Sequence, residues 1–356
     1  MNTSTRTHRV ALAAGLAAAL AALATGCGGS GSSSGVVGAQ QSQSDSASVV
    51  VGAGSTLVAP LLSQWQGDFS KASNLTVTYG AIGSGGGIAQ ISADTVDFGA
   101  SDAPLTADQK SGCPGCVMLP WALAATTVSY NVPGVKPQLR LSGPVIAKMF
   151  LGQITTWNDP AIRKLNPGVS LPSTRVQPIF RSDSSGDTYA FTDYLAHVSP
   201  AAKSKLGVST QVSWPTGTGA KGNSGVAAAV EQTPGAIAYV AIGQATGSNL
   251  AYALVQNRAG QFPALSTKTI AAAAATAMFR PDNSVSIVDP PASAKNAYPI
   301  STFTYAIVHK GSAKIGSLKQ FFAYAVTTGQ QAATKFQFAP LPSAVVAKDK
   351  QIISGL

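Results

Sequence analysis

The chain has 356 residues, of which 45% are hydrophobic and 11% are charged. This composition excludes an intrinsically disordered chain, and the length exceeds what one compact core usually holds, so we expect two domains. The net charge is +10, but the Lys and Arg residues are scattered and form no run. Nucleic-acid binding is therefore not expected, and diffuse attraction of anions or simple solubility is the better interpretation.

The first 27 residues have the pattern of an export signal. Arg6 and Arg9 precede an apolar stretch over 10–24, which is shorter than the roughly 20 residues of a membrane-spanning helix. Small residues then lead to Cys27, as in a lipobox, although Ala24 stands where Leu is usual. We expect cleavage before Cys27 and a lipid on that cysteine. This would anchor the protein at the outer face of the cell membrane or in the periplasm. Ordinary secretion is the alternative.

Residues 28–47 are rich in Gly, Ser and Gln and almost free of apolar side chains. Such a composition predicts a flexible tether that holds the folded part near the membrane without fixing its orientation.

The folded part begins with three strand patterns, each of which runs into a loop of Gly, Ser, Thr or Asp. These strands are expected over 48–51, 75–79 and 96–100. Helix patterns follow the loops 52–56 and 83–87, with apolar side chains at helical spacing. The alternation of strand and helix predicts an α/β fold with a mostly parallel sheet.

Two cysteines, Cys113 and Cys116, enclose a Pro-Gly pair. An exported protein folds in an oxidising compartment, and the chain offers no second pair of metal ligands, so a local structural disulfide is expected. A redox-active pair is the alternative.

The alternation of strand and helix patterns continues to the end of the chain. Strands are expected over 176–180, 236–240 and 304–308, and helices over 145–150, 160–167, 270–279 and 315–326 and around Phe191 and Tyr194. Trp157 and Trp214 are expected to be packing residues rather than ligand contacts.

Three loops, 52–56, 83–87 and 184–188, share a composition suited to an anion. Glycines let the backbone approach a ligand, and the N–H groups at a helix start are unpaired and carry the positive end of the helix dipole. One such loop could be no more than a helix cap. Three of them together with Arg181 at a strand end predict a dehydrated oxyanion site. None is a Walker motif, which argues against nucleotide hydrolysis.

Asp102 is the informative residue of this set. A carboxylate repels an anion unless it accepts a hydrogen bond from it, and at neutral pH phosphate carries a proton whereas sulfate carries none. Asp102 would therefore select phosphate over sulfate, because an acceptor facing an acceptor costs several kcal/mol. An Asx turn before Pro104 is the alternative role for Asp102. Asp183 is expected to orient Arg181 or to cap the following helix, and the two roles are compatible.

At these loops the sequence closely resembles the phosphate-binding protein of the phosphate-specific ABC transporter. Each motif alone is common, but their combination in this order is specific and extends over nearly all of the chain after residue 48. The matching stretches are 52–56, 83–88, 97–105, 154–162, 181–188, 234–240 and 298–300.

The resemblance implies a type II periplasmic-binding-protein fold with two α/β lobes, each a mostly parallel sheet flanked by helices, and a ligand cleft between them. Lobe one would comprise 48–128 and 302–356, and lobe two 129–301, with chain crossings near 129–131 and 300–303. The implied function is high-affinity binding of inorganic phosphate outside the membrane and its delivery to the permease of an ABC transporter. The protein would act as a monomer without enzymatic activity, metal or cofactor.

Carried over by position, the resemblance also implies a set of ligand-binding residues. Asp102 accepts the phosphate proton, Arg181 forms the charge-assisted pair, and the others donate from N–H or hydroxyl groups. Ser55 and Asp183 support this set without direct contact. Asp187 stands where some members have Thr, which removes a hydroxyl donor, and Leu57 replaces an aromatic residue. The phosphate-binding residues are Thr56, Leu57, Ser84, Asp102, Arg181, Ser185, Gly186 and Asp187.

Three other functions remain open from the sequence. A secreted phosphatase or esterase is the rival from another class, although the chain has only three histidines and no Gly-x-Ser-x-Gly elbow. A surface adhesin or phosphate sensor could use the same fold. A receptor for another oxyanion is possible as well, and arsenate in particular has the proton and the shape of phosphate.

Overall fold

The computed structural model describes residues 48–136 and 138–356. The expected signal sequence, the tether and Cys27 lie outside the described residues. In the part of the chain that is described, no helix is long and apolar enough to cross a membrane.

The centre of the fold is one mixed sheet with the strand order β2-β1-β3-β11-β4-β8-β6-β7, and β9 pairs with β4 beside this path. Strands β1, β2 and β3 are parallel to each other, as are β6, β7 and β8, whereas β4 and β11 run antiparallel to their neighbours. The strands are β1 (Ser48–Gly54), β2 (Leu75–Ala81), β3 (Phe98–Ser101), β4 (Cys116–Asn131), β6 (Gln177–Arg181), β7 (Thr218–Ala220), β8 (Ala236–Ala241), β9 (Ala251–Tyr252) and β11 (Ser301–His309), with a separate pair formed by β5 (Arg140–Leu141) and β10 (Leu254–Val255).

The strands of this sheet form two groups. The first sheet section is β2, β1, β3 and β11, and the second sheet section is β8, β6 and β7. Strand β4 belongs to both, because it pairs with β11 as far as Ala125 and with β8 from Thr126 onward. The lobe boundaries expected from the sequence stay a prediction.

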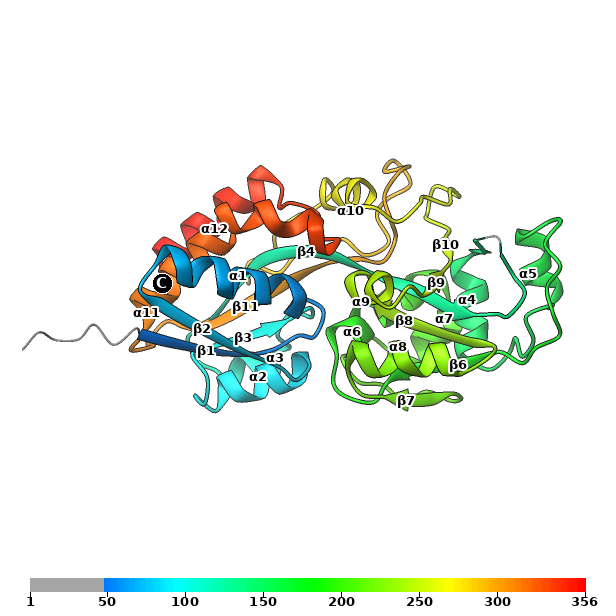
Figure 1. The fold of residues 1–356 in the computed structure, drawn as a ribbon, viewed down its shortest axis with the longest axis horizontal. Coiled ribbons are helices and arrows are strands. Elements are labelled where there is room, and N and C mark those ends of the chain that lie inside the picture. Colours follow the sequence, from blue (N-terminus) through cyan, green and yellow to red (C-terminus); the bar gives the residue numbers. More distant parts are fainter. Residues whose placement is uncertain (1–47, 137) are drawn as a thin grey trace, which may run out of the picture. The chain divides into compact units, whose positions relative to one another are not determined.

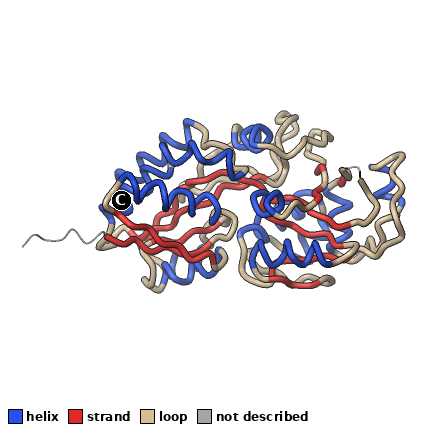
Figure 2. The backbone as a smooth tube through the Cα atoms, viewed as in Figure 1, coloured by secondary structure: helices blue, strands red, loops and turns tan. Residues whose placement is uncertain are grey.

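Helices cover the sheet in both sections (Figure 2). Figure 1 shows α1, α11 and α12 on one side of β1 and β2, and α2 on the other side. The helices are α1 (Ala59–Ala72), α2 (Ser84–Ser92), α3 (Ala107–Ser111), α4 (Gly143–Phe150), α5 (Pro160–Leu165), α6 (Gly186–Val198), α7 (Pro200–Leu206), α8 (Gly222–Gln232), α9 (Ile242–Gly247), α10 (Thr267–Ala274), α11 (Ile315–Ala325) and α12 (Ser343–Ser354), with a 3-10 helix over Thr328–Phe336.

The predicted α/β alternation is confirmed, with three local corrections. β1 continues through Gly52 to Gly54, because it pairs with β2 over its whole length. The glycine-rich stretch 83–87 is mostly helical, since α2 already begins at Ser84. The alanine-rich helix α10 ends at Ala274 instead of continuing to Phe279.

Two aromatic groups fill the core, one for each sheet section. Trp65, Phe98, Trp121, Phe321 and Phe322 pack edge to face or tilted around β3 and α11. The second group, around β8 and α6, is formed by Phe150, Phe191, Trp214 and Tyr239. The prediction that Trp157 and Trp214 are packing residues is confirmed, because Trp157 is fully buried and Trp214 stacks on Phe180.

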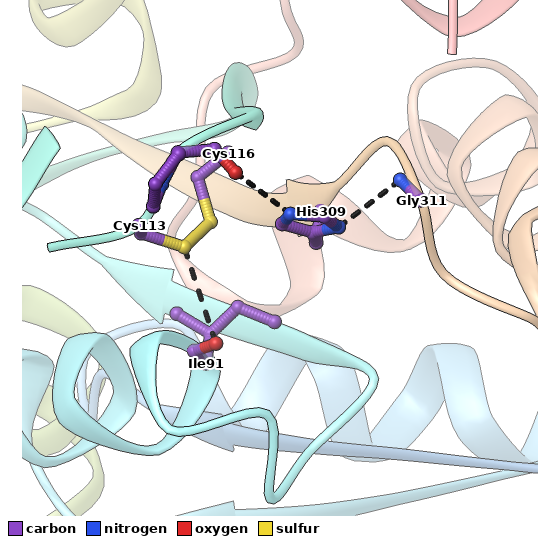
Figure 3. Close-up of a disulfide and its surroundings, with 6 residues drawn as sticks. Ile91, Cys113, Cys116, His309 and Gly311 are labelled. Carbon is purple, nitrogen blue, oxygen red and sulfur yellow. Dashed lines mark hydrogen bonds between the residues drawn. A yellow bond between two sulfur atoms is a disulfide. The ribbon is translucent and has the colours of Figure 1, made fainter. Parts of the chain in front are cut away.

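The predicted disulfide between Cys113 and Cys116 is present at the start of β4 (Figure 3). His309, at the end of β11, fixes the loop that the disulfide closes. Its Nδ1 accepts a hydrogen bond from the N–H of Gly311 (3.0 Å), so Nε2 carries the proton and donates to the carbonyl of Pro114 (2.7 Å). The disulfide therefore closes a short loop at the start of β4, and the hydrogen bond between His309 and Pro114 holds this loop against the end of β11 in the first sheet section.

Candidate functional site

The residues predicted to bind a ligand lie where parallel strands end. Ser55 follows β1, Asp102 follows β3, and Arg181 is the last residue of β6. The helices α2 and α6 begin at Ser84 and Gly186. Carboxyl ends of parallel strands and the starts of the helices that follow them are the usual position of ligand sites in α/β sheets.

Asp102 lies at the centre of the cluster and is only 2% exposed. The hydroxyl of Ser55 donates to both of its carboxylate oxygens (2.6 and 2.7 Å), and the hydroxyl of Ser84 donates to Oδ2 (3.3 Å). Burial, and then the charge of Asp187, raise the pKa of Asp102 to about 7, against the opposing effects of these hydrogen bonds and of Arg181. Near neutral pH this carboxyl group is therefore poised between its protonated and ionised forms.

Arg181 is the buried cation of the cluster, with an exposure of 3%. Its Nε and Nη2 donate to the two carboxylate oxygens of Asp183 (2.7 and 2.5 Å), and its Nη1 donates to Oδ2 of Asp187 (3.1 Å). Burial alone would lower the pKa of Arg181, but the two carboxylates raise it above its usual value. Burial likewise opposes ionisation of Asp183, yet the hydrogen bonds from Arg181 and from the N–H of Gly222 lower the pKa of Asp183.

Asp187 turns its carboxylate toward hydrogen-bond donors inside the protein. Oδ1 accepts from the hydroxyl of Thr126 (2.9 Å), and Oδ2 accepts from Nδ2 of Asn223 (2.7 Å) as well as from Arg181. Its N–H donates to Oγ of Ser185 (3.1 Å), the residue that caps α6. A threonine could not accept this set of bonds, so the aspartate forms a buried ion pair that the sequence did not indicate.

The loops of the two sheet sections contact each other directly. The N–H of Gly186 donates to Oγ of Ser84 (3.1 Å), and the N–H of Gly85 donates to the carbonyl of Ser184 (3.1 Å). Glycine is required on both sides of this contact. A Cβ atom at Gly186 would lie 2.3 Å from Cβ of Asp102, and one at Gly83, where φ is +91°, would lie 2.6 Å from Oδ2 of Asp183.

Thr56 and Leu57 complete the predicted set at the start of the segment before α1. Oγ1 of Thr56 accepts a hydrogen bond from Nδ2 of Asn223 (3.0 Å). The N–H of Leu57 donates to Oγ of Ser55 (3.0 Å), so this hydroxyl is oriented toward Asp102. Ser55 thus contacts the central carboxylate directly, in keeping with the supporting role that the sequence predicts for it. The ten predicted residues form one connected cluster, and their role in binding stays a prediction.

Three residues of the cluster were not predicted from the sequence as part of the site. Asn223, near the start of α8, lies outside the three loops for which the sequence predicts an anion site. Thr126 lies in β4, which was not predicted. The hydroxyl of Tyr239 accepts from the N–H of Arg181 (3.0 Å) and is bonded to Thr188 (2.8 Å). A polar residue at the start of a helix was the available signal for Asn223, and no local signal existed for the other two.

No metal centre is evident in this part of the molecule. Among the described residues, no group of three or more His, Cys, Asp or Glu side chains is arranged to hold a metal ion. The cluster offers N–H and hydroxyl donors, one guanidinium and carboxylates, which suits an anion that also carries a proton.

The sequence and the fold were compared with known proteins. A family model described as a PBP superfamily domain matches residues 39–328. The phosphate-binding protein PstS of Xylella fastidiosa is 39% identical over 312 residues, which cover 86% of this chain and 85% of the relative. The phosphate-binding protein PstS 2 of Mycobacterium tuberculosis is 34% identical over 77% of each chain.

Solved structures support the same fold. A high-affinity periplasmic phosphate-binding protein, PfluDING, has a TM-score of 0.68 and 21% identity, covering 85% of this chain and 93% of its own. The phosphate-binding protein of Stenotrophomonas maltophilia has a TM-score of 0.65 and 20% identity, with 86% and 94% covered. These neighbours share the type II fold expected from the sequence. The chain belongs to the PBP superfamily and, within it, to the family of PstS phosphate-binding proteins.

Proposed function

We propose that this protein binds inorganic phosphate outside the cytoplasmic membrane and delivers it to the permease of an ABC transporter. The relatives that cover most of the chain are named as phosphate-binding proteins. Two α/β lobes would close over the ion, without a chemical step. The protein would be held at the membrane by a lipid on Cys27 and would act as a monomer.

One observation carries the choice of ligand, namely the position of Asp102. Its buried carboxyl lies among the hydroxyls of Ser55 and Ser84, close to Arg181 and to the N–H of Gly186. A group that can accept a proton, surrounded by donors, matches an oxyanion that has both acceptor oxygens and a hydroxyl. Monobasic and dibasic phosphate meet both requirements, whereas sulfate offers no proton.

The remaining predicted residues supply the donors of this proposal. Arg181 would contribute a guanidinium N–H, because Asp183 and Asp187 engage three of the five that it has. Ser84, Ser185 and Gly186 would exchange their present bonds within the protein for bonds to the ion. Thr56 and Leu57 would donate from the start of the segment before α1.

Calorimetric titration of the phosphate-free protein, first with phosphate and then with sulfate, tests the proposal. We expect tight binding of phosphate and no heat with sulfate. In the Asp102→Asn variant the carboxamide can donate through Nδ2, so sulfate should gain affinity while phosphate loses it. Binding of other anions in place of phosphate would contradict the proposal. Release of phosphate from p-nitrophenyl phosphate that depends on Ser185 would favour a hydrolase.

A further inference from the structure

We propose that Asn223 is a positioning residue, an amide latch that joins the two sheet sections across the ligand site and holds Thr56 and Asp187 in place. This inference rests on the proposed function, because the latch is defined by residues of the proposed phosphate site.

The side chain of Asn223 makes three hydrogen bonds, two as a donor and one as an acceptor. It is 2% exposed. Its Nδ2 donates to Oγ1 of Thr56 (3.0 Å) and to Oδ2 of Asp187 (2.7 Å), while its Oδ1 accepts from the N–H of Ala241 (2.8 Å). This last bond fixes the orientation of the amide, since its oxygen can accept a hydrogen bond from a backbone N–H and its NH2 group cannot.

The two donor bonds lead to opposite sides of the site. Asn223 and Asp187 belong to α8 and α6, which pack on β6 and β8 of the second sheet section. Thr56 directly follows β1 and Ser55, in the first sheet section. The bond to Thr56 therefore exists only while the two sections are in contact, whereas the bonds to Asp187 and Ala241 lie within one section.

Contact between the two sheet sections therefore changes the hydrogen bonding of Thr56, a predicted ligand-binding residue. When the sections meet, Thr56 gains a donor for its hydroxyl oxygen, which leaves its hydroxyl hydrogen free to point to a ligand. Without Asn223, Oδ2 of the fully buried Asp187 and Oγ1 of the partly buried Thr56 would each lose a hydrogen-bond partner. The loss at Thr56 would fall only on the form in which the two sections are in contact, so it should accelerate release of a bound ligand rather than slow its capture.

A structural role for Asn223 in holding α8 to Ala241 must be separated from this latch. Asn166 provides a matched control. It is 6% exposed, its Nδ2 donates to the carbonyls of Arg140 and Ile162, and its Oδ1 accepts from the N–H of Arg140. Replacing Asn166 should lower stability much as replacing Asn223 does, but none of its bonds reaches the ligand site.

The experiment compares Asn223→Ala and Asn223→Asp with Asn166→Ala and Asn166→Asp in the full chain. The dissociation constant of inorganic phosphate is measured by calorimetry between pH 5.5 and 8.5, and its release rate by chasing labelled phosphate with unlabelled phosphate. We expect Asn223→Ala to raise the dissociation constant about tenfold, mainly through faster release. The Asn166 variants should bind phosphate like the unaltered protein.

Asn223→Asp adds a measurement that a general loss of stability would not reproduce. The new carboxylate would face Asp187, whose other charged and titratable neighbours are Arg181, Asp102 and Tyr239. At low pH the new carboxyl can carry a proton, so the variant should bind phosphate nearly as well as the unaltered protein does. At pH 8.5 their repulsion should weaken binding on the order of a hundredfold relative to the unaltered protein.

The outcomes distinguish the latch from the proposed function. If the unaltered protein binds phosphate but the Asn223 variants keep its release rate and its pH profile, the latch is wrong and the proposed function stands. The same conclusion follows if Asn166 and Asn223 variants lose affinity equally at every pH. If the unaltered protein fails to bind phosphate, the proposed function is wrong and the latch falls with it. Should Asn223→Ala fail to fold, the pH profile of Asn223→Asp still decides.

Discussion

Replacing Asp102 with Asn should make the ligand-free protein more stable at alkaline pH. Burial and the neighbouring Asp187 raise the pKa of Asp102 from 3.8 to about 7 in the folded protein. The folded state thus keeps a proton that the unfolded chain loses between about pH 4 and 7. The free energy of unfolding therefore falls as the pH rises through this window, and the full penalty applies above pH 7.

The size of this penalty follows from the two pKa values of Asp102. Each pKa unit between the folded and unfolded states is worth about 1.4 kcal/mol, so the gap corresponds to about 4 kcal/mol at pH 8. Asparagine has the same shape and no charge to bury, and the hydroxyls of Ser55 and Ser84 can rotate to suit its amide. We expect the variant to gain about 2–4 kcal/mol at pH 8 and no more than about 1 kcal/mol at pH 4.5.

Urea unfolding of both proteins without phosphate, at several values between pH 4.5 and 8.5, measures the gain. The quantity to follow is the difference between the two proteins at each pH, because buried carboxyls outside the cluster, such as Asp349, contribute equally to both. A difference that does not change with pH would refute the reasoning. So would an unaltered protein that is the more stable of the two at pH 8, since its carboxylate would then be favourably solvated inside the cluster.

Three further substitutions test a buried carboxyl group, the buried guanidinium and the disulfide. Neither carboxylate oxygen of the fully buried Asp349 has a hydrogen-bond partner among the described residues, and burial raises its pKa to about 8. Asp349→Asn should therefore increase the free energy of unfolding, by a few kcal/mol more at pH 9 than at pH 5, as measured with urea. Arg181→Lys should weaken phosphate binding at least about a hundredfold in calorimetry, because an ammonium cannot replace a guanidinium that is shared between two carboxylates; a change below threefold would contradict this role. Replacing Cys113 and Cys116 together by Ser should cost about 2 kcal/mol in urea unfolding, the closure entropy of so short a loop, and leave phosphate affinity unchanged. Loss of phosphate binding in that variant would mean that the disulfide end of β4 is coupled to the site.

The sequence predicted the parts of the site that depend on local order along the chain. Ser55, Asp102 and Arg181 each stand at the end of an apolar strand, and strand ends of a parallel sheet share one edge. The strand β4 was missed because it is buried on both faces over almost all of its 16 residues. Such a strand has no alternation of polar and apolar residues, and Pro120 within it argues against a strand. The proline is accommodated beside the irregularity in the pairing with β11.

The contacts that were missed depend on segments far apart in the sequence. Asn223 donates to Thr56 across 167 positions, and Thr126 donates to Asp187 across 61. No spacing rule relates such pairs, because their distance is set by the packing of α8 and β4 against the rest of the sheet. The same holds for the environment of Asp187. The sequence shows a carboxylate in place of a hydroxyl, but only the fold shows that three donors surround it.

The charges of the cluster favour recognition of an anion through its proton over attraction of an anion by positive charge. Arg181 already faces the carboxylates of Asp183 and Asp187, and Asp102 adds further negative charge as the pH rises. A phosphate ion entering this cluster would therefore meet no excess of positive charge, in spite of the net charge of +10 of the whole chain. In the proposed function, its binding energy would come from N–H and hydroxyl dipoles and from a proton shared with Asp102. An anion without a proton would meet the same dipoles. It would have no hydrogen to donate to the carboxylate of Asp102, so the two would repel each other. In the proposed function, the site would reject such an anion for that reason.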